Sequence, residues 1–166
     1  MIRTYTQEEI TEIYYRQADT VWRVCVTFLG NTAAAEDAMQ DVFMQLLSGK
    51  VLFQSEEHER GWMIVTASNI CKNRLRKKEY FHDNLEDYDR HHGLSDEEGS
   101  AVSREDAVAV REAILALPAK YKEVVYLHYY EGYTTEEIAR LTGMRPATIR
   151  SQLLRARKML QKSLED

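Results

Sequence analysis

The sequence predicts an all-α protein made of two small helical domains that are joined by an acidic, flexible linker. Its 166 residues include only two prolines and seven glycines, and no stretch shows the alternation of Val, Ile and Thr that is typical of a sheet. Apolar side chains recur instead at the three- and four-residue spacing of amphipathic helices. One polar, acidic stretch lacks this periodicity and divides the helices into two groups, of which the second contains a helix-turn-helix.

The N-terminal domain is predicted to occupy residues 1–80 and to contain three helices. The first begins at a capping box at Thr6 and ends at Gly30, and the second carries an apolar face beside acidic side chains. The third runs from about Arg60 to Tyr80 and ends in a basic cluster. The residues predicted to face inward on these helices are Ile10, Ile13, Tyr14, Val21, Val24, Phe28, Ala35, Ala38, Met39, Val42, Leu46, Trp62, Val65 and Ile70.

Residues 81–102 are predicted to form the linker. They are polar and aperiodic, and residues 81–106 hold nine acidic side chains against two basic ones. The 22 linker residues reach at most roughly 75 Å when extended, which is enough for the two domains to occupy separate sites on DNA. Their acidity leads to the hypothesis that the linker fills a basic groove of the free protein through Asp83, Glu86, Asp87 and Asp89.

The C-terminal domain is predicted to occupy residues 103–166. Its first helix stops at Pro118, and a second one continues to Gly132. A capping box at Thr134 then starts a short third helix, which leads through a turn to a fourth. The residues predicted to face inward on the first two helices are Ala107, Val110, Ile114, Leu117, Tyr121, Val124 and Val125.

The last two helices form the predicted helix-turn-helix. In the turn, Gly143 can take a positive φ without strain, and Pro146 suits the first position of the next helix. The buried stripe of that last helix is predicted to be Ile149, Leu153, Ala156 and Leu160. Its other faces are then exposed, and its start is predicted to enter the major groove of DNA.

The net charge of −5 conceals two basic zones. Residues 60–80 hold six basic side chains and one acidic one, whereas the segment from Arg145 to Lys162 holds six basic side chains and no acidic one. Because the local field rather than the total charge steers a polyanion, two separate nucleic-acid contacts are predicted. The alternatives are cations that merely complement a helix C-terminus in the first zone and a helix hairpin with a solvated basic face in the second.

Several motifs follow one another along the chain. Residues 35–43 read AEDAMQDVF, and residues 62–69 read WMIVTASN and are followed by the basic tail to Lys78. Further motifs are Leu117-Pro118, Glu131-Gly132, Glu136-Glu137-Ile138-Ala139, Thr148-Ile149-Arg150-Ser151 and Arg155-Ala156-Arg157. In this order, the motifs resemble the second and fourth regions of bacterial sigma factors of the extracytoplasmic-function (ECF) group, within the sigma-70 family.

The resemblance implies a transcription initiation factor whose partners are core RNA polymerase and promoter DNA. In that family, the N-terminal domain melts and captures the minus-ten element, and the C-terminal domain reads the minus-thirty-five duplex. The resemblance further implies a cytoplasmic protein that is not an enzyme and has no cofactor, metal or small-molecule substrate. An anti-sigma protein is implied as a further partner.

The resemblance and the charge pattern together assign residues to three surfaces. The polymerase-binding residues are Glu36, Asp37, Gln40 and Asp41. The minus-ten strand is expected along Asn69, Lys72, Asn73, Arg76 and Lys77, with residues 48–58 as the loop that captures bases. The residues expected to bind the minus-thirty-five duplex are Thr148, Arg150, Ser151, Leu154, Arg155, Arg157 and Lys158. A buried amide is the alternative for Asn69, and Trp62 is expected in the core rather than as a stacking platform.

Two other functions are considered. A stand-alone helix-turn-helix regulator would need an effector pocket in its N-terminal domain, where the sequence offers an acidic helix followed by a basic one. An enzyme is not expected, because the sequence shows neither a nucleophile–base pairing nor a phosphate-binding glycine loop, and the candidate metal ligands lie in the predicted linker, which cannot hold coordination geometry. Those ligands are Asp89, His91, His92 and Asp96. Cys25 and Cys71 are expected to be small buried side chains in a reducing compartment, and no run of eighteen apolar residues predicts membrane insertion.

Overall fold

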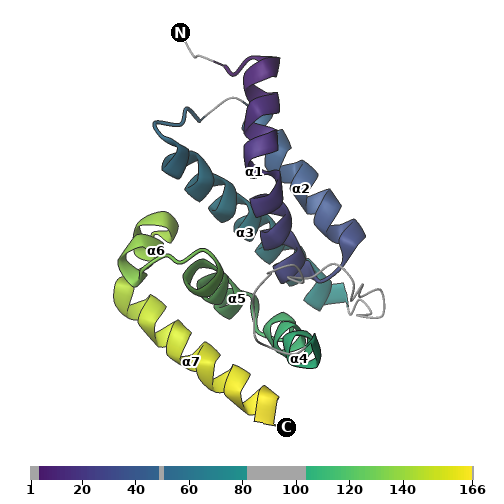
Figure 1. Ribbon diagram of the computed structural model, residues 1–166, viewed down its shortest axis with the longest axis vertical. Helices are drawn as coiled ribbons and strands as arrows, with labels where there is room; N and C mark the ends of the chain where they lie inside the picture. The colour runs from purple at the N-terminus through teal and green to yellow at the C-terminus, as the bar shows by residue number, and fades with distance from the viewer. Residues whose placement is uncertain (1–3, 49–50, 82–103, 166) are drawn as a thin grey trace.

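The computed structural model describes residues 4–48, 51–81 and 104–165. These residues form seven α-helices and one short π-helix without any strand, so the prediction of an all-α fold is confirmed (Figure 1). The elements are α1 (Gln7–Leu29), α2 (Thr32–Leu47), α3 (Glu56–Phe81), α4 (Arg104–Leu115), α5 (Ala119–Val125), the π-helix (Tyr126–Tyr130), α6 (Thr135–Thr142) and α7 (Pro146–Glu165). The predicted linker, apart from Phe81, lies outside the described residues, and so do its acidic side chains.

The ends of α1 lie where the sequence predicts them. The Thr6 hydroxyl accepts a hydrogen bond from the Glu9 amide at 3.1 Å, and the Glu9 carboxylate accepts one from the Thr6 amide at 2.9 Å. These two bonds complete the predicted capping box. At the other end, Gly30 takes a φ of 67°, and its amide donates to the Val26 carbonyl. A side chain would be strained in this conformation, which explains the glycine.

The first three helices pack side by side around an apolar core (Figure 1). Most of the residues predicted to face inward do so. Ile13, Val21, Val24, Phe28, Ala35, Ala38, Val42, Leu46 and Ile70 are buried, whereas Ile10, Met39 and Trp62 are partly buried against the same core. The prediction that Trp62 belongs to the core rather than to an exposed platform is therefore confirmed.

Two local predictions in this region are wrong. Tyr14 does not point into the core but is 43% exposed. Its ring packs at the surface against Phe43 of α2, at a centroid distance of 5.0 Å. The third helix begins at Glu56 rather than near Arg60. The reason is a cap at Ser55, whose hydroxyl accepts a hydrogen bond from the His58 amide at 3.1 Å.

The C-terminal helices form the predicted helix-turn-helix. Thr134 and Glu137 make the capping box of α6, Gly143 ends this helix with a φ of 77°, and Pro146 is the first residue of α7. The predicted stripe of α7 is buried at Ile149, Leu153 and Ala156 and partly buried at Leu160. Ala107, predicted to face inward, is exposed, because the buried residues of α4 lie near its other end.

A π-helix, which the sequence does not predict, connects α5 to the helix-turn-helix. The Glu131 amide donates to the Tyr126 carbonyl at 3.1 Å, five residues back, and the Tyr126 hydroxyl donates to the Glu131 carboxylate at 2.7 Å. Burial, together with the charge of Glu131, raises the pKa of Tyr126. The phenol therefore keeps its proton and remains a donor at neutral pH.

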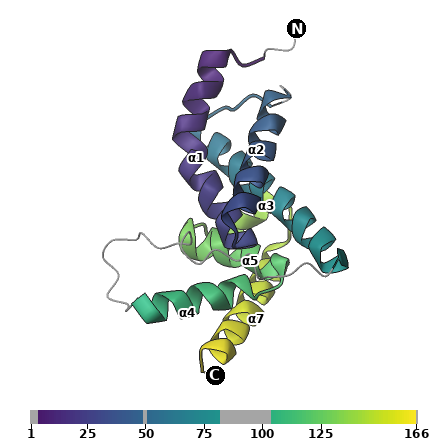
Figure 2. The same cartoon turned by 90° about the vertical axis from the view of Figure 1, so that its right-hand side faces the viewer.

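The two groups of helices pack directly on each other. α1 contacts α4 and α5, and α3 contacts α5 and α6. In two perpendicular views, α4, α5 and α7 lie at the lower end of the first three helices (Figures 1 and 2). One apolar cluster includes buried residues of both groups, among them Phe28 and Cys71 from the first and Val124, Leu127 and Ile138 from the second. The arrangement of the helices is thus set by a shared core as well as by each group's own packing.

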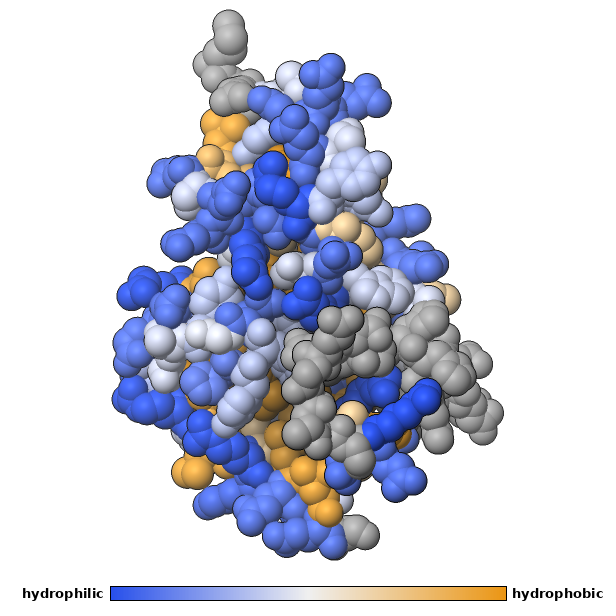
Figure 3. Space-filling model, viewed as in Figure 1, coloured by the Kyte–Doolittle hydropathy of each residue, from blue (hydrophilic) through white to orange (hydrophobic). Residues whose placement is uncertain are grey.

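The surface on the side shown in Figure 3 is mostly hydrophilic, with small separate apolar patches. In the part of the chain that the structure describes, every helix is too short or too polar to cross a bilayer.

Glu59 of α3 connects the two longest helices through a charged contact. Its carboxylate accepts hydrogen bonds from the Arg16 guanidinium at 2.9 and 3.0 Å and from the Gln17 amide at 2.8 Å. Glu59 is only 5% exposed, and this burial alone would raise its pKa. The hydrogen bonds from Arg16 and Gln17 outweigh burial, so the pKa of Glu59 lies below its usual value.

A pH dependence of stability follows from this contact. Because the pKa of Glu59 is lower in the folded than in the unfolded chain, its stabilisation is full above about pH 4.3 and is lost as the pH falls through the folded-state pKa. We expect Glu59→Gln to lower the free energy of unfolding by about 1–2 kcal/mol at pH 7 and by much less in acid. Urea titrations followed by circular dichroism, at pH 7 and at a pH below the folded-state pKa of Glu59, measure the free energy of unfolding. The exposed Glu57, changed to Gln, is the control, and a loss independent of pH would contradict the assignment.

Candidate nucleic-acid and polymerase interfaces

The outward face of α7 is the first candidate site. Its buried stripe, Ile149, Leu153 and Ala156, packs the helix against the rest of the C-terminal group and leaves the remaining faces in solvent. All the side chains predicted to bind duplex DNA are exposed on these faces: Thr148, Arg150, Ser151, Leu154, Arg155, Arg157 and Lys158. The helix therefore presents a cationic surface that begins at the turn of the helix-turn-helix.

Arg157 is held differently from its neighbours on α7. Its Nε donates a hydrogen bond to the hydroxyl of Tyr129, and its guanidinium carbon lies 5.7 Å from the centroid of the Tyr129 ring. Tyr129 belongs to the π-helix, is 52% exposed and was not identified from the sequence. This contact restrains a long cationic side chain on the exposed face of α7.

The second candidate site is the polar face near the C-terminal end of α3. Asn69, Asn73, Arg76 and Lys77 are exposed and Lys72 is half-buried. Their spacing of three, four and seven residues places them on one side of the helix. Because Asn69 is exposed, the alternative that it is a buried structural amide is wrong.

These residues border a groove of about 660 Å³ between the two groups of helices. Its residues are Asn69, Lys72, Asn73, Leu75 and Arg76 from α3 and Pro118, Ala119 and Lys120 from the start of α5. Lys120 was not identified from the sequence, because no pattern near it indicates that α5 lies beside α3 in the fold. Three cations and two amides give the groove the chemistry of an anion site.

Two side chains of this face already have partners within the protein. The Lys72 ammonium donates to the carboxylate of Glu123 on α5, and the Arg76 guanidinium donates to the side-chain oxygen of Asn73. Glu123 is 3% exposed, so this carboxylate is enclosed by the contact between the helix groups. The charge of Lys72 is therefore partly neutralised by Glu123, although its ammonium has further donors.

The third candidate site is the acidic face of α2. Glu36, Asp37, Gln40 and Asp41 are all exposed, on successive turns of the helix. Arg74 of α3 lies beside them, 2.6 Å from a carboxylate oxygen of Asp41 and 3.9 Å from one of Asp37. The face is thus acidic but bordered by a cation that orients two of its carboxylates.

The same face of α2 continues into apolar side chains that were not identified from the sequence. Met44 and Leu47 are 63% and 57% exposed and lie one and two turns beyond Gln40. Large exposed apolar side chains next to a patch of charge are typical of protein–protein interfaces.

The segment predicted to capture bases is anchored by aromatic rings. Phe53 lies 5.9 Å from Tyr5, 5.4 Å from His58 and 5.6 Å from Trp62, measured between ring centroids. The Phe53 amide also donates to the Tyr5 hydroxyl at 2.8 Å. Leu52, next to this cluster, is 48% exposed. Residues 49–50 lie outside the described residues, and His58 belongs to the first turn of α3 rather than to a loop.

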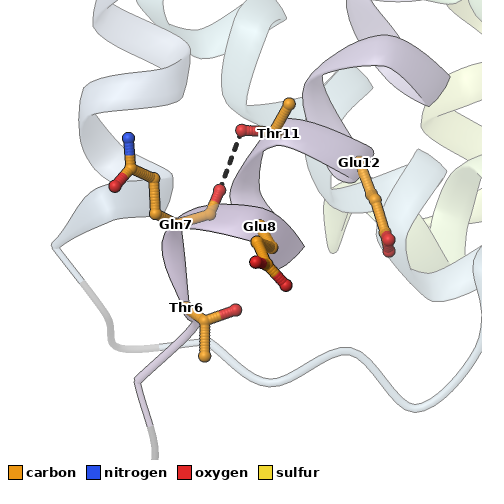
Figure 4. Close-up of a pocket in the computed structure, with 5 residues that line it drawn as sticks. All are labelled: Thr6, Gln7, Glu8, Thr11 and Glu12. Carbon is orange, nitrogen blue, oxygen red and sulfur yellow. Dashed lines mark hydrogen bonds between the residues drawn. The ribbon is translucent and has the colours of Figure 1, made fainter.

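A depression at the start of α1 is lined by Thr6, Gln7, Glu8, Thr11 and Glu12 (Figure 4). It has two carboxylates and no basic side chain, and the Thr11 hydroxyl donates to the Gln7 carbonyl at 2.8 Å rather than facing a ligand. No group of metal-binding side chains occurs among the described residues, and Asp89, His91, His92 and Asp96 fall outside them.

The two cysteines are both buried and unbridged. A hydrogen bond with Cys25 and, to a smaller extent, burial raise the pKa of Cys71 well above its ordinary value. The group therefore remains a thiol at neutral pH.

Comparison with known proteins identifies the regions that carry these faces. The model of sigma-70 region 2 matches residues 13–80, which include α2 and α3, and the model of sigma-70 region 4 matches residues 107–160, which include the helix-turn-helix. The chain belongs to the sigma-70 family. The resemblance seen in the sequence is thereby confirmed, with both regions in the predicted order.

Similar proteins include several ECF sigma factors. The ECF RNA polymerase sigma factor SigW of Bacillus subtilis is 28% identical, with 95% of this chain and 88% of that protein covered. SigL of Mycobacterium tuberculosis is 24% identical, with 93% and 88% covered. Among solved structures, the sigma factor RpoE of Bartonella quintana, crystallised with the anti-sigma factor NepR, shares the fold with a TM-score of 0.69 at 20% identity, over 95% of this chain and 98% of that one.

A change in salt dependence is expected for α7 of this sigma-70 family member. If Lys158 contacts a phosphate, Lys158→Ala makes the negative slope of log affinity against log salt shallower by about 0.9 on any duplex sequence. Fluorescence anisotropy with a labelled duplex at several salt concentrations measures the slope. Arg104→Ala removes an equal charge from the exposed start of α4 and serves as the control. Equal slopes for Lys158→Ala and the unaltered protein would remove Lys158 from the interface.

Proposed function

We propose that this protein is a transcription initiation factor that binds core RNA polymerase and directs it to specific promoters. One observation carries the proposal: a single chain combines three exposed charged surfaces. The segment matched by region 2 has an acidic face and a basic face, and the segment matched by region 4 has an exposed cationic helix. The relatives named ECF RNA polymerase sigma factors support it over most of their own length.

The proposed division of labour assigns one partner to each face. The face of α2 with Glu36, Asp37, Gln40 and Asp41 binds the polymerase. The polar face of α3 holds the melted minus-ten strand through Asn69, Lys72, Asn73, Arg76 and Lys77. Melting loses base stacking, and a protein offsets this cost by holding the phosphates in a basic groove and the unstacked bases against side chains. The aromatic segment around Phe53 is the proposed base-contacting element.

The start of α7 is proposed to read the minus-thirty-five duplex. Arg150 and Arg155 have the donors that pair with guanine, and Ser151 and Leu154 can contact base edges and methyl groups. Arg157 and Lys158, farther along the helix, are assigned to phosphates, and Thr148 to the backbone or a thymine methyl group. If the other four cations between Arg145 and Lys162 meet phosphates, affinity falls roughly 10²-fold for a fourfold rise in salt.

The proposed role needs no catalytic residue and no cofactor, and we place it in the cytoplasm, where bacterial promoters and polymerase meet. An anti-sigma protein is proposed as a further partner, in analogy with the structural neighbour that was crystallised with one. A stand-alone helix-turn-helix regulator is not favoured, because the match to region 2 assigns the N-terminal helices a role other than effector binding.

Transcription with purified core polymerase tests the proposal. We expect transcripts from genomic DNA only when both the protein and core are present, and sequencing their start sites will reveal both promoter elements. Reversing one charge on the polymerase face, Asp37→Lys, is expected to lower core binding and transcription about tenfold while duplex binding by the free protein is unchanged.

The control for this variant is Asp19→Lys, which reverses a charge at an exposed position of α1 away from the proposed face. Specific duplex binding by the free protein, without any core-dependent initiation, would overturn the proposal in favour of a stand-alone regulator.

A further inference from the structure

Tyr129 points away from the core in a segment that otherwise packs inward. It is 52% exposed, whereas the other four residues of the π-helix are buried or half-buried. The π-helix directly continues α5, and α5 packs against α7. Tyr129 therefore stands beside α7 without being a member of the apolar core.

The ring and the hydroxyl of Tyr129 both contact Arg157 of α7. The Arg157 Nε donates a hydrogen bond to the hydroxyl, and the guanidinium carbon lies 5.7 Å from the ring centroid. A guanidinium has donors on three nitrogens, and this hydrogen bond uses Nε alone. The two terminal nitrogens can pair side by side with two oxygens of one phosphate. Tyr129 thus holds the inner part of the guanidinium and does not occupy the outer part.

The Tyr129 ring is itself supported by His128. The two rings meet edge to face, with centroids 4.9 Å apart and planes at 79°. The His128 Nδ1 lies 2.9 Å from the Tyr133 carbonyl, which can only accept, so Nδ1 carries a proton and donates. The Tyr133 amide in turn donates to the Leu127 carbonyl at 3.0 Å. A chain of contacts therefore runs from the loop before α6 through two rings to Arg157.

Arg157 lies on the face of α7 that is assigned to DNA. It follows Arg150 by seven residues and Leu154 by three, a spacing that places all three side chains on one side of the helix. Seven residues span about 10 Å along a helix, and the major groove is about 8.5 Å deep. When the start of α7 enters the groove, Arg157 is consequently at the level of the phosphates.

We propose that Tyr129 is a positioning residue for the minus-thirty-five duplex, which holds the Arg157 guanidinium so that its terminal nitrogens face one phosphate. This inference rests on the proposed function. An arginine that is restrained before binding loses less side-chain entropy when DNA binds, which corresponds to about a fivefold gain in affinity. Tyr129 acts through Arg157 and needs no contact of its own with DNA.

Substitutions of Tyr129 in the full chain, alone and combined with Arg157→Ala, test this role. The probe is a fluorescein-labelled duplex of mixed sequence, because a phosphate contact carries no sequence information. We expect Tyr129→Leu, which removes the ring and the hydroxyl, to weaken binding about fivefold in fluorescence anisotropy. Tyr129→Phe keeps the ring and should weaken binding about twofold. Once Arg157→Ala has removed the side chain that Tyr129 holds, neither change should alter the affinity further.

The controls separate positioning from folding and from loss of charge. Arg104→Ala removes an equal charge from the exposed start of α4, and in this background Tyr129→Leu should keep its full effect. Tyr15→Leu replaces a tyrosine of α1 that is 78% exposed and should leave duplex affinity unchanged. Arg157→Ala should make the negative salt slope shallower by about 0.9, whereas Tyr129→Phe should preserve the slope, because the arginine keeps its charge. Circular dichroism should show the same helix content in every variant.

The outcomes distinguish the role of Tyr129 from the function on which it rests. Equal losses from Tyr129→Leu with and without Arg157 would overturn the inference, because Tyr129 would then act independently of the arginine. Tighter binding by Tyr129→Leu would also overturn it, because the tyrosine would then withhold Arg157 from DNA. If the unaltered protein initiates transcription with core polymerase, the proposed function stands after either result. Coupling between the two residues without core-dependent initiation would overturn the proposed function and support the role of Tyr129 in duplex binding.

Discussion

The structure depends on α3, because this helix contacts α1 and α2 on one side and α5 and α6 on the other. A single helix can pack against two groups only if apolar residues occur around much of its circumference. α3 meets this condition with Met63, Ile64, Ala67, Ile70 and Cys71, all of them buried. The polar face that remains, from Asn69 to Lys77, is consequently narrow and lies directly beside the contact between the groups.

Local chemistry made much of the fold predictable from the sequence. The capping boxes at Thr6 and Thr134, the left-handed glycines and Pro146 act within a few residues of their own position, so their effect can be read without knowing the rest of the fold. The buried stripe of α7 was predictable for the same reason, since a helix repeats at a fixed period. The exposure of the proposed site residues was predictable as well, because these residues lie on the helix faces opposite or beside the buried ones.

Partners that are distant in sequence were not predictable. Lys72 and Glu123 are 51 residues apart, and no periodicity connects them. Tyr129 and Lys120 were missed for the same reason: each joins a site whose predicted members lie on another helix. Tyr14 was assigned to the core because of its spacing along α1. In the fold, its ring packs against Phe43 of α2 on one side and is otherwise exposed. Sequence patterns thus locate faces of helices, whereas the pairing of those faces depends on the assembled fold.

The π-helix at Tyr126–Tyr130 contributes to the direction in which the chain leaves α5 for the helix-turn-helix. Each residue of an α-helix advances the chain by 100°, so a widened turn rotates everything that follows relative to an uninterrupted helix. That rotation brings Glu131 back over Tyr126, five residues earlier, and orients the carboxylate so that Arg60 can reach it. The chain then turns at Gly132, which has a φ of 75°, before α6 begins at Thr135. The widened helical turn and this glycine therefore act together to direct α6 and, through it, the recognition helix.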